Sequence, residues 1–256
     1  MIPLKTEKEI LIMKEGGQKL AQILKKLKES VKPGIKTKDL EELAKKLVSK
    51  EGAICSFKGY KDKESTSLPY PACLCTSVNE ELVHVPPSNR VLKEGDVLKL
   101  DLGIFYKGFH TDMAITIPVG KISFEAQRLI RVTKKALKLA IKKARPGNTF
   151  GDIGNTIQRY VESQGFNVIR DLCGHGIGKN LHEEPKILNF GKRKTGEKIK
   201  EGMVFCIEPM VSLGDWKIEK TKDGFGYKMK DNSLCAHFED TIAITKKGAL
   251  VLTKLE

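Results

Sequence analysis

The strongest constraint on the fold of this 256-residue chain is a pattern that occurs twice. A stretch with helical spacing of apolar residues ends at Lys32-Pro33-Gly34, and a second such stretch ends 113 residues later at Arg145-Pro146-Gly147. Each is followed by a shorter helical stretch that stops at a glycine, Gly52 in the first copy and Gly165 in the second. Because Pro and Gly interrupt helices, their agreement at one offset predicts two related halves.

The two copies also predict the same order of elements. We expect helices from about Glu7 to Val31, Lys38 to Lys50, Ser123 to Arg145 and Gly151 to Gln164. Farther along, Lys93-Glu94-Gly95-Asp96-Val97 recurs 107 residues later as Lys200-Glu201-Gly202-Met203-Val204, and Asp101 then falls on Glu208. No linker separates the halves, roughly residues 1–120 and 121–256. We therefore expect one domain, residues 1–256, of the α/β (α+β) class, with its halves related by a pseudo-twofold axis.

Composition excludes several classes of protein. With 40% hydrophobic and 30% charged residues, the chain fits a globular protein and not a disordered one. It contains no run of about 18 apolar residues that would span a membrane. The first residues lack the apolar core of a signal peptide, so we expect a cytosolic protein.

The cysteine pattern favours reduced thiols. A disulfide framework is not expected in the reducing cytosol. Cys73 and Cys75 are one residue apart, and no second close pair completes a zinc knuckle. We therefore predict buried free thiols. The six cysteines are Cys55, Cys73, Cys75, Cys173, Cys206 and Cys235.

Two carboxylates are predicted to share one face of a hairpin. Residues 96–106 and 109–118 are typical of strands joined by a tight turn. In the simplest register Asp101 lies opposite Ala114, and Asp112 lies on the same face, diagonal to Asp101. Diagonal neighbours are about 7–8 Å apart at their backbones. Their oxygens could then bracket metal ions, which two-metal hydrolases hold about 3.5–4 Å apart.

The second half supplies two further acids. Glu208 ends the apolar run that begins at Met203, and Glu239 precedes the predicted strand Thr241–Thr245. By the pseudo-symmetry, Glu208 should lie across the axis from Asp101. Any one of these acids could be a solvated strand residue. Four on one sheet face would repel one another without cations, so the set predicts a polynuclear metal site.

All five histidines lie outside the lysine-rich helices, in segments with Gly, Pro or paired carboxylates. His175 lies between Gly174 and Gly176, which allow its ring to approach a crowded site closely. Imidazole combined with carboxylates suits Mn, Fe, Co or Zn better than Mg alone. The histidines are His84, His110, His175, His182 and His237.

Six short motifs, spread over nearly the whole chain, resemble the type I bacterial short form of methionine aminopeptidase, a pita-bread metallopeptidase family. The motifs are Asn79-Glu80 through His84-Val85-Pro86, Leu100-Asp101 through His110-Thr111-Asp112, Gly174-His175-Gly176-Ile177-Gly178, Leu181-His182-Glu183-Glu184-Pro185, Ile207-Glu208-Pro209-Met210 and Phe238-Glu239-Asp240-Thr241. The resemblance implies a curved antiparallel sheet covered by helices. It also implies a monomer that removes the N-terminal methionine from nascent proteins when the second residue is small.

The resemblance further implies two divalent ions, Co, Mn, Fe or Zn. Their implied ligands are Asp101, Asp112, His175, Glu208 and Glu239. Asp112 and Glu239 would bridge both ions, and a hydroxide between the ions would attack the first peptide carbonyl. Glu208 matches a ligand that also accepts a proton. His84 matches the residue near the scissile amide nitrogen, and His182 matches one that contacts the substrate carbonyl.

By position in the family, an apolar pocket would hold the methionine side chain. Its implied walls are Tyr60, Tyr70, Cys75, His84 and Phe225, with Leu181 beside His182. Polarizable contacts suit a thioether, although ordinary core is the alternative for Tyr60, Tyr70 and Phe225. Five residues depart from the usual family pattern: Val85, Thr111, Leu181, Phe225 and Asp240.

Two rival functions were weighed. Prolidases and Xaa-Pro aminopeptidases share the fold but normally add a sizeable N-terminal domain, whereas only about eighty residues precede His84. A non-catalytic pita-bread protein that binds RNA or a partner through a basic surface is the second rival. Such proteins lose metal ligands, and all five ligand positions are retained here.

The formal charge of +14, from 46 Lys and Arg against 32 Asp and Glu, leaves two interpretations open. It could reflect solvated lysine on helices, or a polyanion partner such as ribosomal RNA that docks weakly. The acid-poor clusters are Lys134, Lys135, Lys138, Lys142, Lys143 and Arg145, and Lys192, Arg193, Lys194, Lys198 and Lys200.

Overall fold

The computed structural model describes residues 2–61 and 68–254. Its four helices match the predicted ones to within one or two residues at each end. They are α1 (Glu7–Ser30), α2 (Thr37–Lys50), α3 (Phe124–Lys143) and α4 (Phe150–Ser163). In the described part of the chain, none of these helices is long and apolar enough to cross a membrane.

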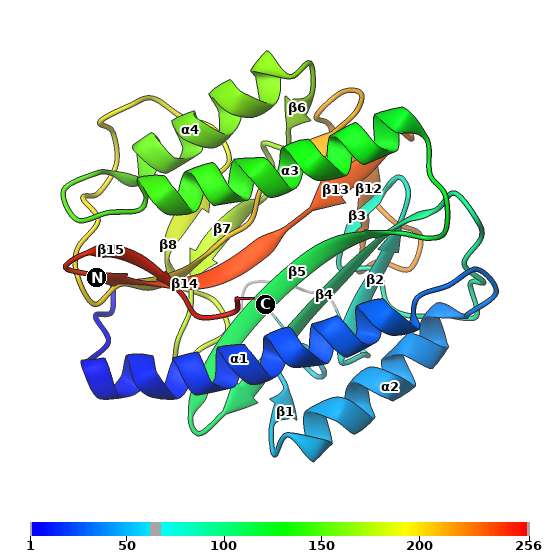
Figure 1. Cartoon of the computed structure of the whole chain (residues 1–256), viewed down its shortest axis with the longest axis horizontal. Helices are drawn as coiled ribbons and strands as arrows, with labels where there is room; N and C mark the ends of the chain where they lie inside the picture. Colours follow the sequence, from blue (N-terminus) through cyan, green and yellow to red (C-terminus); the bar gives the residue numbers. More distant parts are fainter. Residues whose placement is uncertain (1, 62–67, 255–256) are drawn as a thin grey trace.

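A large antiparallel sheet forms the centre of the molecule (Figure 1). Seven of its strands follow one another across the sheet in the order β1 (Ile54–Cys55), β4 (Val97–Tyr106), β5 (Phe109–Pro118), β14 (Glu239–Thr245), β9 (Val204–Ile207), β7 (Cys173–Gly176) and β8 (Glu183–Leu188). Two more strands join it, β2 (Leu74–Val78) on β4 and β15 (Gly248–Val251) on β14. Strands from the two sequence halves therefore meet where β5 pairs with β14.

Two small three-stranded sheets complete the described strands. The first contains β13 (Cys235–His237), β10 (Met210–Ser212) and β6 (Asn167–Val168). The second contains β11 (Ile218–Lys220), β12 (Tyr227–Met229) and β3 (Glu81–Val83).

The predicted hairpin register is confirmed. Tyr106 pairs with Phe109, Asp101 pairs with Ala114, and Gly103 pairs with Asp112. The turn residues Lys107 and Gly108 both have positive φ, +47° and +91°, which is the backbone of a two-residue hairpin turn that matches strand twist.

Local conformations recur at the offsets of the sequence repeat. In α2, a carboxylate oxygen of Asp39 accepts a hydrogen bond from the backbone N–H of Lys36, and in α4 Asp152 accepts one from Thr149. Each acid lies three residues after the residue that caps its helix. Its carboxylate accepts a hydrogen bond from the backbone N–H of that capping residue, which has no partner within the helix. The glycines before β4 and β9 also match, with φ of +94° at Gly95 and +84° at Gly202. The assignment of the chain to one domain stays a prediction.

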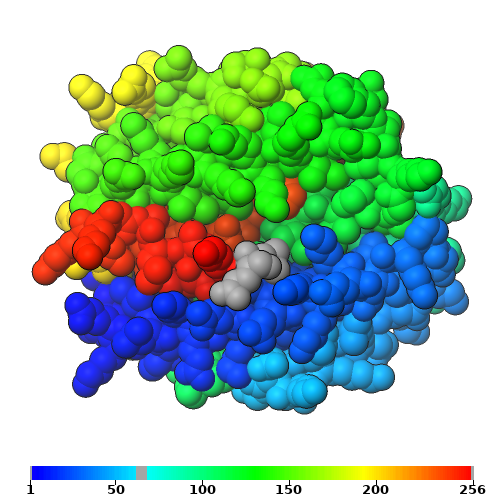
Figure 2. Space-filling model, viewed as in Figure 1, coloured from blue at the N-terminus to red at the C-terminus, as the bar shows by residue number. Residues whose placement is uncertain are grey.

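The four helices cover one face of the large sheet (Figure 1). Leu20, Leu24 and Leu27 of α1 are fully buried in the main core, which also contains residues of α3 and of the central strands. α1 passes very close to the C-terminal segment at Gly17, where any Cβ would clash with the Leu252 carbonyl oxygen. Figure 2 shows the C-terminal segment in red at the surface, between α1 in blue and α3 in green.

The prediction of six free thiols is wrong for two cysteines, because Cys55 and Cys73 form a disulfide. β1 and β2 lie in succession along the same edge of β4, with Cys55 opposite Ile104 and Leu74 opposite Leu102. The chain thus leaves this edge after Cys55 and returns to it at Cys73, with their Cα atoms 5.1 Å apart. That distance is normal for a disulfide. Sequence spacing alone does not reveal this return to one strand edge.

Reduction of this disulfide is expected to destabilise the fold. A bond that closes a loop with a sequence separation of 18 removes chain entropy from the unfolded state. That effect is worth about 3 kcal/mol for a loop of this size. Urea unfolding with and without dithiothreitol measures it. The double variant Cys55→Ser/Cys73→Ser should unfold at the same urea concentration in both conditions, and Cys173→Ser should keep the wild-type difference. An unchanged wild-type midpoint under dithiothreitol would contradict the expectation.

Candidate metal centre

Each of the four central strands contributes one carboxylate to the same region. In the order of the sheet, Asp101 lies on β4, Asp112 on β5, Glu239 at the start of β14 and Glu208 directly after β9. Ala114 pairs with both Asp101 and Glu239, which places these two acids in one row across three strands. On β9, Ile207 pairs with Asp240, so Glu208 continues the row beyond Glu239. We call these four residues the acid cluster.

The acid cluster is largely buried, with only Glu208 half-buried, and its members are close to one another. Asp101, Asp112 and Glu239 have relative exposures of 7%, 3% and 3%. Burial, reinforced by neighbouring carboxylates, raises the pKa of Asp101, Glu208 and Glu239 well above their ordinary values. Burial also raises the pKa of Asp112 to about 7. Ionised carboxylates in this arrangement repel one another, so either protons or cations must balance them.

Three groups of side chains have ligand atoms that all lie within 4.8 Å of one another. They are Asp101 with Asp112 and Glu239, Glu208 with His237 and Glu239, and His175 with Cys206 and Glu239. Glu239 belongs to every group, which makes it the centre of the site. The structure thus brings all five sequence-predicted ligands together.

His175 is oriented with one ring nitrogen toward the acids. Its Nδ1 lies 2.9 Å from the Gly176 carbonyl oxygen, so Nδ1 carries the proton and donates it. Nε2 lies 3.8 Å from Glu208 Oε1 and 3.8 Å from Glu239 Oε1. Burial lowers the pKa of His175 to about 4, so the ring is neutral near pH 7 and Nε2 has a free electron pair. Second-shell bonds of this kind orient metal-binding histidines.

Sequence reasoning gave no site role to two residues that the structure places here, Cys206 and His237. Cys206 precedes Glu208 by two residues on β9, and His237 precedes Glu239 by two at the end of β13. The period-two alternation of strand side chains would have placed them beside the two acids. His237 is 1% exposed, its Nε2 is 3.3 Å from Glu208 Oε2, and burial lowers its pKa to about 3.

The donor set fits divalent transition-metal ions. In the described part of the chain, Asp101 Oδ1, Glu239 Oε1 and both ring nitrogens of His237 are buried without a hydrogen-bond partner. Buried polar atoms are normally paired, and both Asp101 and His237 belong to a ligand group that contains Glu239, which fits a cation at the site. Oxygen, imidazole and sulfur donors together suit Mn, Fe, Co or Zn.

Two of the predicted substrate residues flank the cluster at the surface. The ring centroid of His182 is 4.4 Å from that of His175, and its Nδ1 is 2.7 Å from the Tyr60 hydroxyl. His84 follows β3 with φ of +60°, a left-handed conformation that is uncommon for a non-glycine residue. His84 and His182 are both exposed. The fifth histidine, His110, instead pairs its Nδ1 with the Ser56 hydroxyl at 2.8 Å.

The predicted pocket walls also lie near one another. The ring of Tyr70 packs edge-on against Phe225, with centroids 5.8 Å apart. Cys75 pairs with Asp101 across β2 and β4, so an apolar wall directly adjoins the acid cluster. Cys75 and Leu181 are buried in a second apolar cluster, against which Tyr60 and Tyr70 pack.

The five departures from the family pattern have different surroundings. Leu181 and Phe225 belong to the apolar wall just described. Val85 is buried, and its carbonyl oxygen accepts a hydrogen bond from Thr76 N at 2.8 Å. Thr111 is buried beneath α1, where a Cβ on Gly16 would lie 3.7 Å from its hydroxyl oxygen. Asp240 accepts a hydrogen bond from the Thr253 hydroxyl at 2.9 Å.

Buried carboxylates and a neutral imidazole that converge on one face of a sheet are the residue set of a metal-dependent hydrolase. The chain belongs to metallopeptidase family M24, whose profile matches residues 12–246. It is 43% identical over 256 residues to a methionine aminopeptidase of Clostridium perfringens, covering 100% of both chains. It is 45% identical over 257 residues to one of Aquifex aeolicus, covering 99% of both.

Solved structures confirm the predicted pita-bread fold. The chain matches a methionine aminopeptidase from Thermotoga maritima with a TM-score of 0.95 and 44% identity, covering 99% of this chain and 100% of that one. A prolidase from Pyrococcus furiosus matches with a TM-score of 0.78 and 23% identity, covering 99% of this chain and 66% of the prolidase. The prolidase likeness shows the fold alone. The non-catalytic RNA-binding alternative gains no support from these relatives.

Divalent cations are expected to stabilise the fold. A cation at 100 times its dissociation constant stabilises the folded state by about 2.7 kcal/mol per site. Thermal unfolding of the protein in EDTA, compared with Mn²⁺ or Co²⁺, measures this effect. Asp112→Asn removes one buried charge, so in EDTA the variant should melt above the wild type and gain less from the cation. Equal melting temperatures of the wild type with and without cation would contradict the model of an uncompensated acid cluster.

Proposed function

We propose that this metallopeptidase removes the N-terminal methionine from proteins whose second residue is small. The observation that carries the proposal is the acid cluster with His175, in a chain that its methionine aminopeptidase relatives match from end to end. The proposed substrate is the exposed N-terminal peptide of a nascent chain, and the proposed location is therefore the cytosol. We also propose that the protein acts as a monomer.

In this proposal, the centre holds two divalent ions, drawn from Co, Mn, Fe and Zn. The residues that would hold them are Asp101, Asp112, His175, Glu208 and Glu239, with Asp112 and Glu239 shared between the ions. Such ions polarise a peptide carbonyl, lower the pKa of bound water and stabilise developing negative charge. Cellular supply would decide among the four metals, because their affinities for such a site follow a common order.

The residues around the centre provide the remaining chemistry. Glu208 is the proposed proton acceptor, because its carboxylate lies beside the other ligands where the peptide would be attacked. His182 is the proposed contact for the substrate carbonyl oxygen. The hydrogen bond between the Tyr60 hydroxyl and its Nδ1 fixes the orientation of that ring. His84, exposed at the same edge, is the proposed contact near the scissile amide nitrogen.

Specificity for methionine would come from the apolar wall beside the cluster. Tyr60, Tyr70, Cys75, His84 and Phe225 are the proposed side-chain contacts. Aromatic edges and a thiol offer polarizable surface to a thioether.

The first test is peptide cleavage by the metal-loaded protein. Protein loaded with Mn²⁺, Co²⁺ or Fe²⁺ is expected to release methionine from Met-Ala peptides and not from Met-Lys peptides. Asp112→Asn should lower kcat/KM by at least about 100-fold, because replacing an outer-shell residue already costs 10–100-fold. Chromatographic detection of free methionine measures both.

Thr116→Val serves as the matched control, because Thr116 lies on β5 with Asp112 and bonds the backbone of His237. It should alter stability more than catalysis. Failure of every divalent metal to support cleavage of any peptide that begins with Met would refute the proposed function. Wild-type turnover by Asp112→Asn would refute the shared-ligand arrangement.

We further propose that the basic surface docks weakly on ribosomal RNA. The two lysine-rich clusters of the sequence meet at a cavity of about 440 Å³ between α4 and the segment before β9, lined in part by Lys143, Arg159 and Arg193. In the described part of the chain, none of these three cations forms an ion pair within 4 Å. Unpaired cations around one hollow suit the phosphates of a folded RNA.

Co-sedimentation with ribosomes tests this docking. The triple variant Lys143→Glu/Arg159→Glu/Arg193→Glu should bind more weakly. Its log–log salt slope should be less steep by about 2–3, since each neutralised phosphate contributes about 0.9 in duplex nucleic acid. The matched control is Lys8→Glu/Lys25→Glu/Lys26→Glu, which makes the same charge change on exposed positions of α1. No association of the wild type at low salt, or equal losses in both variants, would overturn the proposal.

A further inference from the structure

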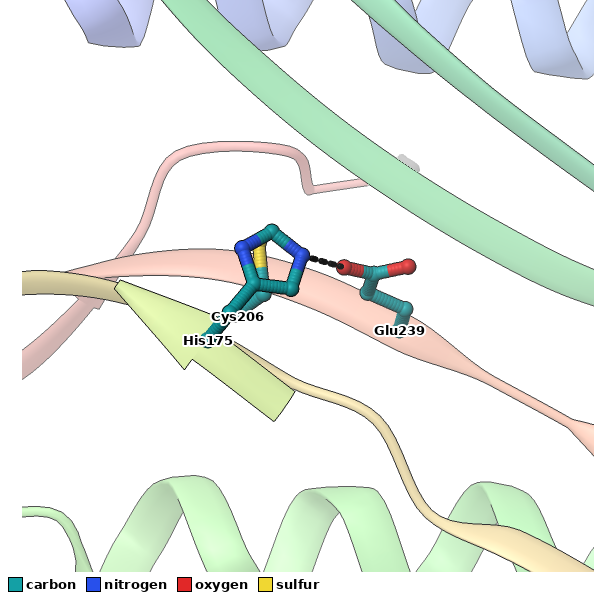
Figure 3. A group of neighbouring side chains, drawn as sticks. All are labelled: His175, Cys206 and Glu239. Carbon is teal, nitrogen blue, oxygen red and sulfur yellow. Dashed lines mark ion pairs between the residues drawn. The ribbon is translucent and has the colours of Figure 1, made fainter. Parts of the chain in front are cut away.

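Cys206 lies inside the metal centre. It is fully buried on β9, and its side chain shares the face of Glu208, two residues farther along the strand. Its Sγ, a ring nitrogen of His175 and a carboxylate oxygen of Glu239 all lie within 4.8 Å of one another. Figure 3 shows the sulfur beside the imidazole ring, with the ring pointing toward Glu239.

The hydrogen bonds around Cys206 leave its sulfur electron pairs available. The Thr241 hydroxyl donates to the Asp112 carbonyl oxygen at 2.7 Å and accepts from the Asp112 backbone N–H at 2.9 Å. The Thr241 proton is therefore committed, so in the 3.4 Å contact between Cys206 Sγ and Thr241 Oγ1 the thiol is the donor. The Cys206 thiol also hydrogen-bonds the Glu239 side chain. Both contacts use the thiol proton and leave the sulfur electron pairs available.

The other two members of the group also present unused electron pairs. Glu239 Oε1 is buried without a hydrogen-bond partner in the described part of the chain. Glu239 Oε1 lies 3.8 Å from His175 Nε2. In a neutral imidazole only one nitrogen carries a proton. Nδ1 carries it and donates it to the Gly176 carbonyl oxygen, so Nε2 has a free electron pair. One oxygen, one nitrogen and one sulfur donor therefore lie within 4.8 Å of one another.

We propose that His175, Cys206 and Glu239 form a sulfur-containing site for a thiophilic divalent cation such as Co²⁺, Zn²⁺ or Cd²⁺. On binding, Cys206 releases its thiol proton to solvent and its sulfur forms the bond to the cation, with no change of oxidation state. Imidazole and thiolate favour soft or borderline ions, whereas the all-carboxylate group of Asp101, Asp112 and Glu239 favours Mn²⁺ and Mg²⁺. Cys206 thus makes one side of the centre selective for softer metals than the other side.

The inference rests on metal binding at the proposed centre, and it does not depend on peptide cleavage. The other described free thiols, Cys75, Cys173 and Cys235, belong to none of the three ligand groups. Cys173 is the sharpest control, because it lies on β7 two residues before His175 and its side chain therefore shares the face of that ligand.

Absorption spectroscopy of the full chain with added Co²⁺ tests the site directly. Protein freed of metal by a chelator is titrated with Co²⁺, and the ultraviolet thiolate-to-cobalt charge-transfer band is followed together with the visible ligand-field bands. The wild type and Cys173→Ser should show both sets of bands. Cys206→Ser should keep the ligand-field bands and lose the charge-transfer band.

Competition with a chelator gives a second readout. Cys206→Ser should weaken Cd²⁺ binding roughly 10–100-fold, as the loss of a metal-site partner does elsewhere, and change Mn²⁺ affinity less than about twofold. A charge-transfer band that persists in Cys206→Ser, or ligand-field bands in the wild type without a charge-transfer band, would overturn this inference and leave the metal centre standing. If the wild type binds none of these ions, the inference and the proposed function both fail.

Discussion

Repulsion among four buried carboxylates is the constraint on which the rest of the structure depends. Asp101, Asp112, Glu208 and Glu239 come from four neighbouring strands, and burial raises the pKa of each. A fold with marginal net stability can keep such a cluster only where cations or protons balance it. The helices cover one face of the sheet (Figure 1). Leu100 and Leu102 of β4 lie in the main core, so the alternation of strand side chains places Asp101 between them on the other face.

The repeated halves explain how the cluster is assembled. β4 and β9 flank β5 and β14 in the sheet, so each half supplies one outer and one inner strand to the same central row. Because each of these strands positions one acid, the four carboxylates come together without any special loop. The same sheet places Cys206 and the Cys55–Cys73 disulfide. Cys206 changes the donor chemistry of the centre, whereas the disulfide holds the base of the segment that carries Tyr60 and Tyr70.

Much of the fold could be predicted because its signals are local. The helices begin and end where caps, Pro and Gly place them, and the hairpin register follows from the two-residue turn at Lys107 and Gly108. The alternation of side chains in that register placed Asp101 and Asp112 on one face before any tertiary contact was known. The resemblance to a known family then supplied the roles of the distant acids and histidines, and those roles stay predictions.

The sequence by itself determined the elements, the hairpin register and the residue types of a metal-dependent hydrolase, because each depends on neighbours along the chain. Only the tertiary structure decided which strand edges meet. It joined Cys55 to Cys73, placed Cys206 against His175 and Glu239, and left the two ring nitrogens of His237 buried without a hydrogen-bond partner in the described part of the chain. Those outcomes depend on strand pairing between residues far apart in sequence, and the period of a single strand carries no information about its partner.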